Sequence, residues 1–426
     1  MKYLKFLIII GFIAIFVSSC THDMENSIAD GSAFPERKTI GKRTMSEALA
    51  IAQSSTKLLS SGNTRSVSEK KINLKDLRVV CKATRSATDI DTLMYVFNFE
   101  DSLGFAIVSA NEFTPGLIAI TESGYYDPDE EQENEAFAAL MASAREYIES
   151  KALINKDSLH PIPFFPDTII ELRYEVSPMV PVKWGQDMMY GKYCYNNVTG
   201  CAPLAAAQAM TYLRKPASIQ LSYLGHDVDC LNLNWNDLRR HILYYAPNGT
   251  ESTSYCSASY NAHDVIGKLC FQLGLNMNSI YYSMPDSTQN YTSTTKGGIS
   301  AGLNSLGLPS TFVNYTKGST ISPLNNGHIL YFVGFTESES GHAWLVDGYQ
   351  LNDVQILTDG PIPGQYCYLH TDVYYNHINW GWHGCANGFF LDEVFNIQQS
   401  FCLDDNPYHT NANHNFIDGL QFIELY

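Results

Sequence analysis

The sequence has few charged side chains and no run of basic ones. Of its 426 residues, 17% are charged, and 27 Lys and Arg against 44 Asp and Glu give a formal net charge of −17. Proteins that bind nucleic acid usually present a basic patch to the phosphates. We therefore expect no nucleic-acid partner. Hydrophobic residues make up 45% of the chain, which excludes a mostly disordered protein.

The short spacings that are typical of metal sites are also missing. The chain has 10 Cys and 12 His, yet no Cys-x-x-Cys or His-x-x-x-His pair occurs. Because compact zinc sites commonly use such spacings, we expect no metal and no cofactor. The cysteines remain open to roles as disulfide partners, lipid anchor or nucleophile.

One apolar run stands out, and it lies at the N-terminus. Phe6–Val17 is an uncharged run of twelve residues behind two lysines, and the sequence Ser18-Ser19-Cys20 follows it. A bilayer-spanning helix needs about 20 residues, so this run is typical of an export signal. Small residues before the cysteine resemble a bacterial lipobox. We expect residues 1–20 to be a lipoprotein signal peptide with Cys20 lipidated; an ordinary signal peptide with a chance cysteine is the alternative.

Residues 21–42 are polar and predict a linker, and residues 43–157 predict a small α+β domain. A helical segment at 45–52 has Ser46 placed to cap its start. Two β-rich runs at 93–99 and 104–109 predict a hairpin, and a third strand is expected at 117–121. An Ala-rich helix should follow at 135–150. This domain contains no evident nucleophile.

Prolines 161, 163, 166 and 178 indicate an extended, exposed connector at 158–180, which would be sensitive to proteases. The remaining residues, 181–426, are richer in Gly, Tyr, Trp and His and contain eight of the ten cysteines. We therefore expect the chemistry to lie in this second domain.

The run TGCAPLAAAQAM, from Thr199 to Met210, is the sharpest local feature. Its glycine permits a tight turn, and the Ala-rich part predicts a helix that can be buried on nearly all sides. Pro203 fits only the first turn, so the helix should begin at about Cys201. A thiol at that end lies at the positive end of the helix dipole, which favours the thiolate. The alternative is an inert cysteine before a core helix.

Three further segments supply the groups that a nucleophilic cysteine needs. The sequence GHAWLVDGY places His342 at the start of an apolar strand, where it could deprotonate a thiol. In HINWGWHGCANGFF, Asn379 could hydrogen-bond the imidazole, and Trp380 or Trp382 could shield that bond. The sequence Trp184-Gly185-Gln186 offers an amide that could stabilise an oxyanion. A lone surface histidine remains the simpler interpretation of His342 by itself.

The order WGQ, GCAPLAAAQAM, GHAWLVDGY and NWGWHGCANGFF resembles the streptopain-like C10 family of papain-like cysteine peptidases. The resemblance covers Pro181 to about Asn396, and FAIVSA at Phe105–Ala110 resembles the family's prodomain. It implies an α+β fold with a helical lobe and an antiparallel β lobe at 181–426, preceded by a small α+β inhibitory prodomain.

The resemblance also implies roles for single residues. Cys201 would be the nucleophile and His342 the base and later the acid. Asn379 and Trp380 would orient and cover the histidine, and Gln186 would contribute to the oxyanion hole. The chain departs from the family pattern at Ala202-Pro203-Leu204, at His383, where glycine is usual, and at Cys385, without removing a catalytic group.

These features predict an envelope-anchored lipoprotein, periplasmic or at the cell surface, or a secreted protein after processing. We expect a cysteine endopeptidase made as a zymogen, with protein or peptide substrates, its own prodomain as inhibitor, and the membrane as partner through Cys20. A papain-like amidase or transferase and a catalytically silent surface binding protein are the alternatives.

Overall fold

The computed structural model describes residues 41–59, 73–82, 91–130, 135–152, 171–186, 188–223, 226–240, 244–245, 251–252, 262–283, 290–335, 341–361, 366–395 and 420–426. The predicted signal peptide with Cys20, residues 21–40 of the linker and residues 158–170 of the connector lie outside this part of the chain. Among the described helices, none is both long and apolar enough to cross a membrane.

The N-terminal domain is built from helix α1 (Met45–Ser55), strands β1 (Leu74–Lys82), β2 (Asp91–Phe99), β3 (Phe105–Ser109) and β4 (Leu117–Thr121), and helix α2 (Glu135–Ala152). Two short 3-10 turns, η1 (Thr56–Leu59) and η2 (Glu100–Ser102), connect these elements. The four strands pair antiparallel in chain order. The predicted hairpin, third strand and Ala-rich helix are therefore confirmed.

The predicted cap of the first helix was wrong by two residues. The N-cap is Thr44, whose hydroxyl accepts a hydrogen bond from the Glu47 N–H at 3.3 Å, while the Glu47 carboxylate accepts one from the Thr44 N–H at 2.9 Å. Ser46 lies inside the first turn. The reciprocal Thr-x-x-Glu pairing satisfies two N–H groups that the helix leaves unbonded, which a serine at position 46 could not do.

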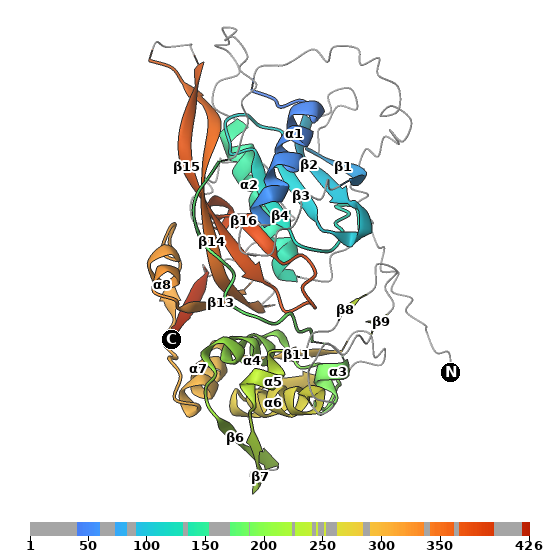
Figure 1. Ribbon diagram of the computed structural model, residues 1–426, viewed down its shortest axis with the longest axis vertical. Helices are drawn as coiled ribbons and strands as arrows, with labels where there is room; N and C mark the ends of the chain where they lie inside the picture. The colour runs from blue at the N-terminus through green and yellow to red at the C-terminus, as the bar shows by residue number, and fades with distance from the viewer. Residues whose placement is uncertain are drawn as a thin grey trace, which may run out of the picture.

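Helices dominate the next part of the chain, at the bottom of Figure 1. They are α3 (Met188–Gly191), α4 (Cys201–Leu213), α5 (Trp235–Leu238), α6 (Ala262–Asn276) and α7 (Lys296–Ser305). Three small hairpins accompany them: β6 (Ser218–Tyr223) with β7 (His226–Asn232), β8 (Tyr244–Tyr245) with β9 (Glu251–Ser252), and β10 (Ile280–Tyr282) with β11 (Tyr291–Ser293).

The last part is mainly strand. It contains β12 (Val313–Asn314), α8 (Ile321–Asn325), β13 (Ile329–Phe335), β14 (Gly341–Asp359), β15 (Tyr366–Asn379), β16 (Gly388–Leu391), η4 (Asp392–Phe395) and β17 (Gln421–Leu425). With β5 (Glu171–Val176), these strands and those of the N-terminal domain form one 11-stranded sheet. The predicted α+β architecture, with a helical lobe, an antiparallel β lobe and a small α+β prodomain, is confirmed.

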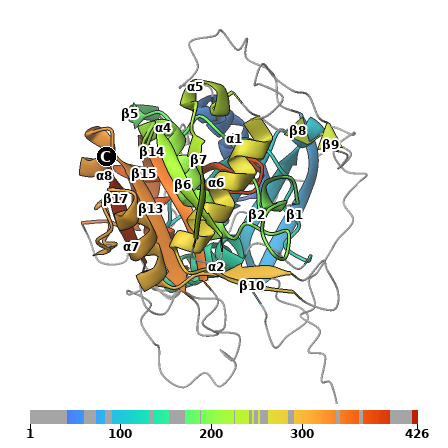
Figure 2. The same cartoon turned by 90° about the horizontal axis from the view of Figure 1, so that it is seen from below.

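The two domains meet inside this sheet. Strand β4 pairs antiparallel with β16, with Thr121 opposite Gly388 and Ile120 opposite Phe389. The strand order β1-β2-β3-β4-β16-β15-β14-β13-β17-β12 therefore continues from the prodomain into the β lobe without an edge between them. Figure 2 shows strands β1 and β2 to one side of the helices that cover the β lobe.

The β lobe contributes to two cores because its side chains alternate between the two faces of the sheet. One core contains Leu330, Phe332, Trp344 and Val346 together with side chains of helices α1 and α2. The other contains Tyr331, Val333, Ala343 and Leu345, which pack with the helical lobe. From the prodomain, Phe137 of α2 packs edge-on against Trp380, with ring centroids 6.2 Å apart. The prodomain thus completes the hydrophobic core of the β lobe.

The described end of the predicted connector is extended, but it is paired rather than free. Strand β5 pairs antiparallel with β14, placing Val176 opposite Tyr349. Beyond β5, the N–H of Met179 donates to the carbonyl oxygen of Asp347 at 3.0 Å. Residues 171–176 are therefore part of the sheet, and residue 179 is hydrogen-bonded to it.

Candidate active site

Helix α4 begins at Cys201, as the position of Pro203 predicted. Gly200 precedes it with φ 83° and ψ 149°, a conformation that L side chains rarely adopt. Cys201 is half-buried at the helix end where the first N–H groups have no partner within the helix. The helix dipole and these N–H groups favour a thiolate there.

Two other cysteines of the helical lobe are in a different environment. Burial raises the pKa of the Cys194 thiol to about 12 and raises that of Cys270 well above its usual value. Both side chains are buried, with Cys270 fully inaccessible. They are protonated, inert core residues, and Cys201 is the cysteine of this lobe that lies at a helix start.

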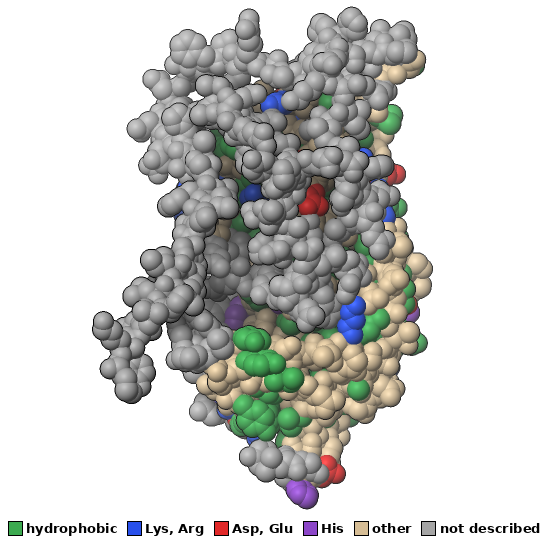
Figure 3. Space-filling view, turned by 180° about the vertical axis from the view of Figure 1, so that it is seen from behind, with side chains coloured by type: hydrophobic (Ala, Val, Ile, Leu, Met, Phe, Trp, Pro, Cys, Tyr) green, Lys and Arg blue, Asp and Glu red, His purple; other side chains and the backbone are tan. Residues whose placement is uncertain are grey.

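The loop before Cys201 rests on the β10–β11 hairpin. A side chain at Gly200 would lie 2.9 Å from the Cβ of Thr292, so only glycine allows this approach. The Thr292 hydroxyl donates to the Val198 carbonyl at 2.8 Å. On the other face of the hairpin, Tyr282 and Tyr291 are exposed and stacked at 4.6 Å. Figure 3 shows hydrophobic side chains gathered on this lobe.

The β lobe brings His342 to the helical lobe. Helix α4 packs against β14, and the Tyr331 hydroxyl of β13 donates to the Ala202 carbonyl at 2.9 Å. His342 is the second residue of β14, and its Nε2 donates to the carbonyl oxygen of Trp380 at 3.3 Å. The imidazole lies nearly parallel to the ring of Trp344, with centroids 6.2 Å apart.

Trp380 lies behind this histidine and is 1% exposed. Its indole N–H donates to the Ala386 carbonyl at 3.1 Å, and its backbone N–H donates to the side chain of Asn387 at 3.0 Å. The indole also packs against Trp344, with centroids 5.6 Å apart. Trp380 thus contacts His342 through its backbone carbonyl, and its indole packs against Trp344, the ring that stacks on His342.

Asn379 makes contacts that sequence reasoning did not predict. Among the described residues, its side-chain nitrogen donates to the Val182 carbonyl at 3.0 Å, and its oxygen accepts from the Gly381 N–H at 3.1 Å. Its amide also lies against that of Gln208, with N···O distances of 3.3 and 3.4 Å. The expected hydrogen bond to His342 is not among these contacts, and the neighbouring carbonyl of Trp380 approaches the imidazole instead.

Three buried side chains position the segment that leads to Gln186. The bonds fall on alternate residues of this segment. The Asp347 carboxylate accepts from the Val180 N–H at 2.7 Å, and the Asn379 amide donates to the Val182 carbonyl. The Gln208 side-chain oxygen accepts from the Trp184 N–H at 2.9 Å. The carbonyl of Gln186 then accepts from the Thr199 N–H at 3.1 Å. Gln186 is thereby tied to the loop that precedes Cys201.

Sequence reasoning missed Gln208 as a residue of this site. It is 1% exposed, and it is the one amide in the Ala-rich run of α4. A lone polar residue in a helix that is buried on nearly all sides must find internal partners, and that was the available signal.

His377 lies in the HINWGWHGCANGFF motif, and the sequence predicted no role for it. Its Nδ1 lies 2.6 Å from the Asp347 carboxylate.

Comparison with known families agrees with this geometry. Residues 184–390 match the Peptidase C10 family, and residues 38–148 match the family described as Spi protease inhibitor. The chain is a C10-family peptidase with an inhibitor-type prodomain. The predicted family resemblance is confirmed, and the segments containing Gln186, Cys201, His342 and Asn379 all lie within the C10 match.

Among solved structures, a fragment of prointerpain A from Prevotella intermedia is similar to this C10 peptidase. The two chains are 21% identical, the match covers 82% of this chain and 97% of that one, and the TM-score is 0.49. No curated protein sequence matched the chain significantly.

The contacts of Gln208 predict that Gln208→Leu lowers peptidase activity in excess of its effect on stability. Loss of the amide leaves the Trp184 N–H and the Asn379 amide without this partner, at a cost of about 1–3 kcal/mol in unfolding free energy. Displacement of the Gln186 segment should lower kcat/KM by about 10- to 100-fold. Urea unfolding and peptide hydrolysis after prodomain removal measure the two effects.

Gln272→Leu is the matched control because Gln272 is also 2% exposed but bonds Ser222 and Asn276 on the far side of the helical lobe. It should lose similar stability and keep its activity. Equal activity losses in the two variants would contradict the positioning role of Gln208.

Proposed function

We propose that this peptidase is a cysteine endopeptidase with Cys201 as its nucleophile. The observation that carries the proposal is the position of Cys201 at the start of α4, which packs against β14, the strand whose second residue is His342. The loop before Cys201 is hydrogen-bonded to Gln186. A fixed thiol next to a histidine and amide donors is the arrangement that acyl transfer requires.

In the proposed reaction, His342 takes the proton of Cys201 and the thiolate adds to the carbonyl carbon of the scissile peptide bond. The tetrahedral intermediate collapses when the C–N bond breaks and His342 donates its proton to the leaving amine. Water then adds to the thioester, loses a proton to His342, and displaces the thiol as the new carboxylic acid forms.

Gln186 and the Cys201 backbone N–H are the proposed oxyanion donors. The hydrogen bonds from Asp347, Asn379 and Gln208 support this role because they fix the Gln186 segment before substrate binds. Preorganised donors lower the barrier more than mobile ones do. Asn379 would act mainly through this segment, and Trp380 through the His342 Nε2–H and the exclusion of water.

We also propose that the protein is made as a zymogen and is anchored in the cell envelope through Cys20. The inhibitor-type prodomain supports the first part, and the lipobox-like sequence at Cys20 supports the second. We expect the cleavage that releases activity to fall between about residues 156 and 182. Because residues 171–182 are hydrogen-bonded to the β lobe, the section before residue 171 is the better candidate.

The nucleophile is tested with a peptide library and a thiol-reactive epoxide, after prodomain removal. The parent protein should cleave peptides and carry the epoxide on Cys201 by mass spectrometry, whereas Cys201→Ala should do neither. Cys230→Ala, which removes an exposed cysteine, should behave like the parent. Labelling without cleavage would favour an amidase or transferase, and the absence of both would leave a silent binding protein.

Zymogen behaviour predicts that the uncut chain hydrolyses peptides at least tenfold more slowly than the peptidase freed of its prodomain. Limited proteolysis with N-terminal sequencing locates the cut, which should fall before residue 171, and an activity assay follows it. Cys201→Ala treated in the same way controls for the added protease. Equal activity of the uncut and freed forms would reject an inhibitory prodomain.

Lipid attachment predicts that expression in a bacterial host with labelled palmitate labels the parent protein and leaves Cys20→Ser unlabelled. The labelled form should partition into detergent because a buried acyl chain gains about 0.8 kcal/mol per CH₂. An unlabelled parent protein, cut at a position other than Cys20, would show an ordinary export signal.

A further inference from the structure

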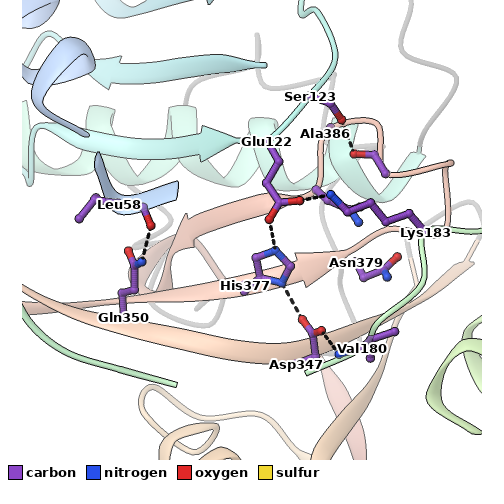
Figure 4. A network of polar contacts seen from close by, with 12 residues as sticks. Leu58, Glu122, Ser123, Val180, Lys183, Asp347, Gln350, His377, Asn379 and Ala386 are labelled. Carbon is purple, nitrogen blue, oxygen red and sulfur yellow. Dashed lines mark hydrogen bonds and ion pairs between the residues drawn. The ribbon is translucent and has the colours of Figure 1, made fainter. Parts of the chain in front are cut away.

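One carboxylate of the prodomain lies between two basic side chains of the peptidase. Glu122 directly follows β4, and its Oε1 lies 3.4 Å from Nε2 of His377, while Oε2 pairs with the ammonium of Lys183. Figure 4 shows this arrangement from close by. The Glu122 side chain is 25% exposed and that of His377 is 4% exposed. We call these three residues the Glu122 clamp.

Together with Asp347, the charges of the clamp are balanced. Burial alone would lower the pKa of His377, but Asp347 and Glu122 outweigh it and raise the pKa to about 9. Burial alone would raise the pKa of Glu122, but His377 and Lys183 outweigh it and lower the pKa to about 2. At neutral pH a cationic imidazole therefore bridges two carboxylates, an arrangement that is stable only while each charge keeps its partner.

Backbone hydrogen bonds continue on both sides of the clamp. The Glu122 N–H donates to the Asn387 carbonyl at 2.8 Å, and the Ala386 N–H donates to the Ser123 carbonyl at 3.1 Å. The Ser123 hydroxyl donates to the Gly384 carbonyl at 2.7 Å. Together with the β4–β16 pairing, these bonds make residues 117–123 an added strand on the peptidase.

Removal of the prodomain would open this surface. Strand β16, with the sequence Gly-Phe-Phe-Leu, would become an apolar edge strand, which proteins usually cover. His377 would keep Asp347 as its partner, and Lys183 would lose the Glu122 carboxylate. The free peptidase would thus present a strand edge with a carboxylate site beside it.

We propose that the peptidase recognises its prodomain as an acidic strand, with the β16 edge binding the backbone and His377 and Lys183 binding the Glu122 carboxylate, so that the prodomain stays bound after the connector is cut. This inference rests on the proposed zymogen function. It makes release of the prodomain, rather than cleavage of the connector, the step that frees the active site.

The clamp also predicts how prodomain binding depends on pH. The pKa of His377 is raised in the complex, so its contribution to binding is complete below the pKa that His377 has in the free peptidase and is lost as pH rises through about 9. The pKa of Glu122 is lowered, so its contribution is complete above its ordinary value of 4.5 and is lost as pH falls toward 2. The two groups face one another, with Asp347 beside His377 and Lys183 beside Glu122.

The test measures release of the peptidase from a cut but otherwise complete chain. Cys201→Ala protein is made with a site for a sequence-specific protease placed within residues 158–170 and an affinity tag at the prodomain end. After immobilisation and cutting, the rate at which the peptidase fragment leaves the support is recorded. Variants are Glu122→Gln, which removes the charge of the clamp, and Glu100→Gln, which removes a charge from the exposed turn η2.

We expect Glu122→Gln to release the peptidase at least tenfold faster than the parent, and Glu100→Gln to differ from it by less than twofold. Raising the salt to 1 M, or the pH from 7 to 9.5, should speed release of the parent and leave Glu122→Gln unchanged. If no form dissociates in buffer, the urea concentration for half-release should rank the variants in the same order.

Equal release rates for Glu122→Gln and Glu100→Gln would overturn the proposal, as would equal salt effects on the parent and Glu122→Gln. Since the assay uses Cys201→Ala and measures dissociation, it needs no catalysis. A failure of the proposed peptidase chemistry would appear in the epoxide and cleavage assays instead, so the two failures are distinguishable.

Discussion

The antiparallel pairing of β4 with β16 joins the prodomain to the peptidase in one sheet, and the rest of the structure depends on it. Through this pairing the sheet has no break between the domains, and helix α2 of the prodomain packs against β14. Phe137 thereby reaches Trp380, the residue behind His342. The prodomain is therefore structural support for the strands that carry His342 and Asn379.

The second constraint is polar and acts on a single extended segment. Residues 180, 182 and 184 are each bonded by one buried side chain, and all three side chains come from elements that also carry proposed catalytic residues. Asp347 lies on the strand of His342, and Gln208 lies on the helix of Cys201. Because buried polar groups must be hydrogen-bonded, residues 180–184 can pair with these three side chains in few alternative registers. The position of Gln186 thus follows from the same elements that place Cys201 and His342, the proposed nucleophile and base.

Lys183 lies in the middle of this segment, and its side chain points to the prodomain. Alternation along an extended chain sends it to the opposite side from the buried side chains of Val182 and Trp184, where it meets Glu122. Asp347, which bonds Val180, is also the partner of His377. Lys183 thus belongs both to the clamp and to the segment that leads to Gln186, and Asp347 contacts both. Prodomain binding and the position of this segment are therefore physically linked.

Local chemistry made much of this predictable from the sequence. Pro203 after Gly200 located the start of α4, and alternating β-rich runs located β2, β3 and β4 to within two residues. The prediction of the N-cap of α1 was wrong because both Thr44 and Ser46 are residue types that cap helices well. Only the reciprocal hydrogen bonds between Thr44 and Glu47 distinguish them. Local rules of this kind describe helix ends and hairpins well.

Contacts between distant segments were beyond such rules. The pairing of β4 with β16 depends on register between strands that lie far apart in the chain, and no turn specifies it. The partners of Gln208 and Glu122 are likewise set by the folded arrangement, although a buried amide in an Ala-rich helix signals that partners exist. Asn379 shows the same limit, since its motif predicted a histidine contact and its described bonds go to Val182, Gln208 and Gly381.

The shared sheet is the central claim, and amide hydrogen exchange tests it most directly. In the full chain, the amides of residues 117–122 and of Ala386 should exchange as slowly as those inside the β14–β15 hairpin, and they should stay protected after the connector alone is cut. Exchange at the rate of an exposed strand edge in the uncut chain would contradict the account.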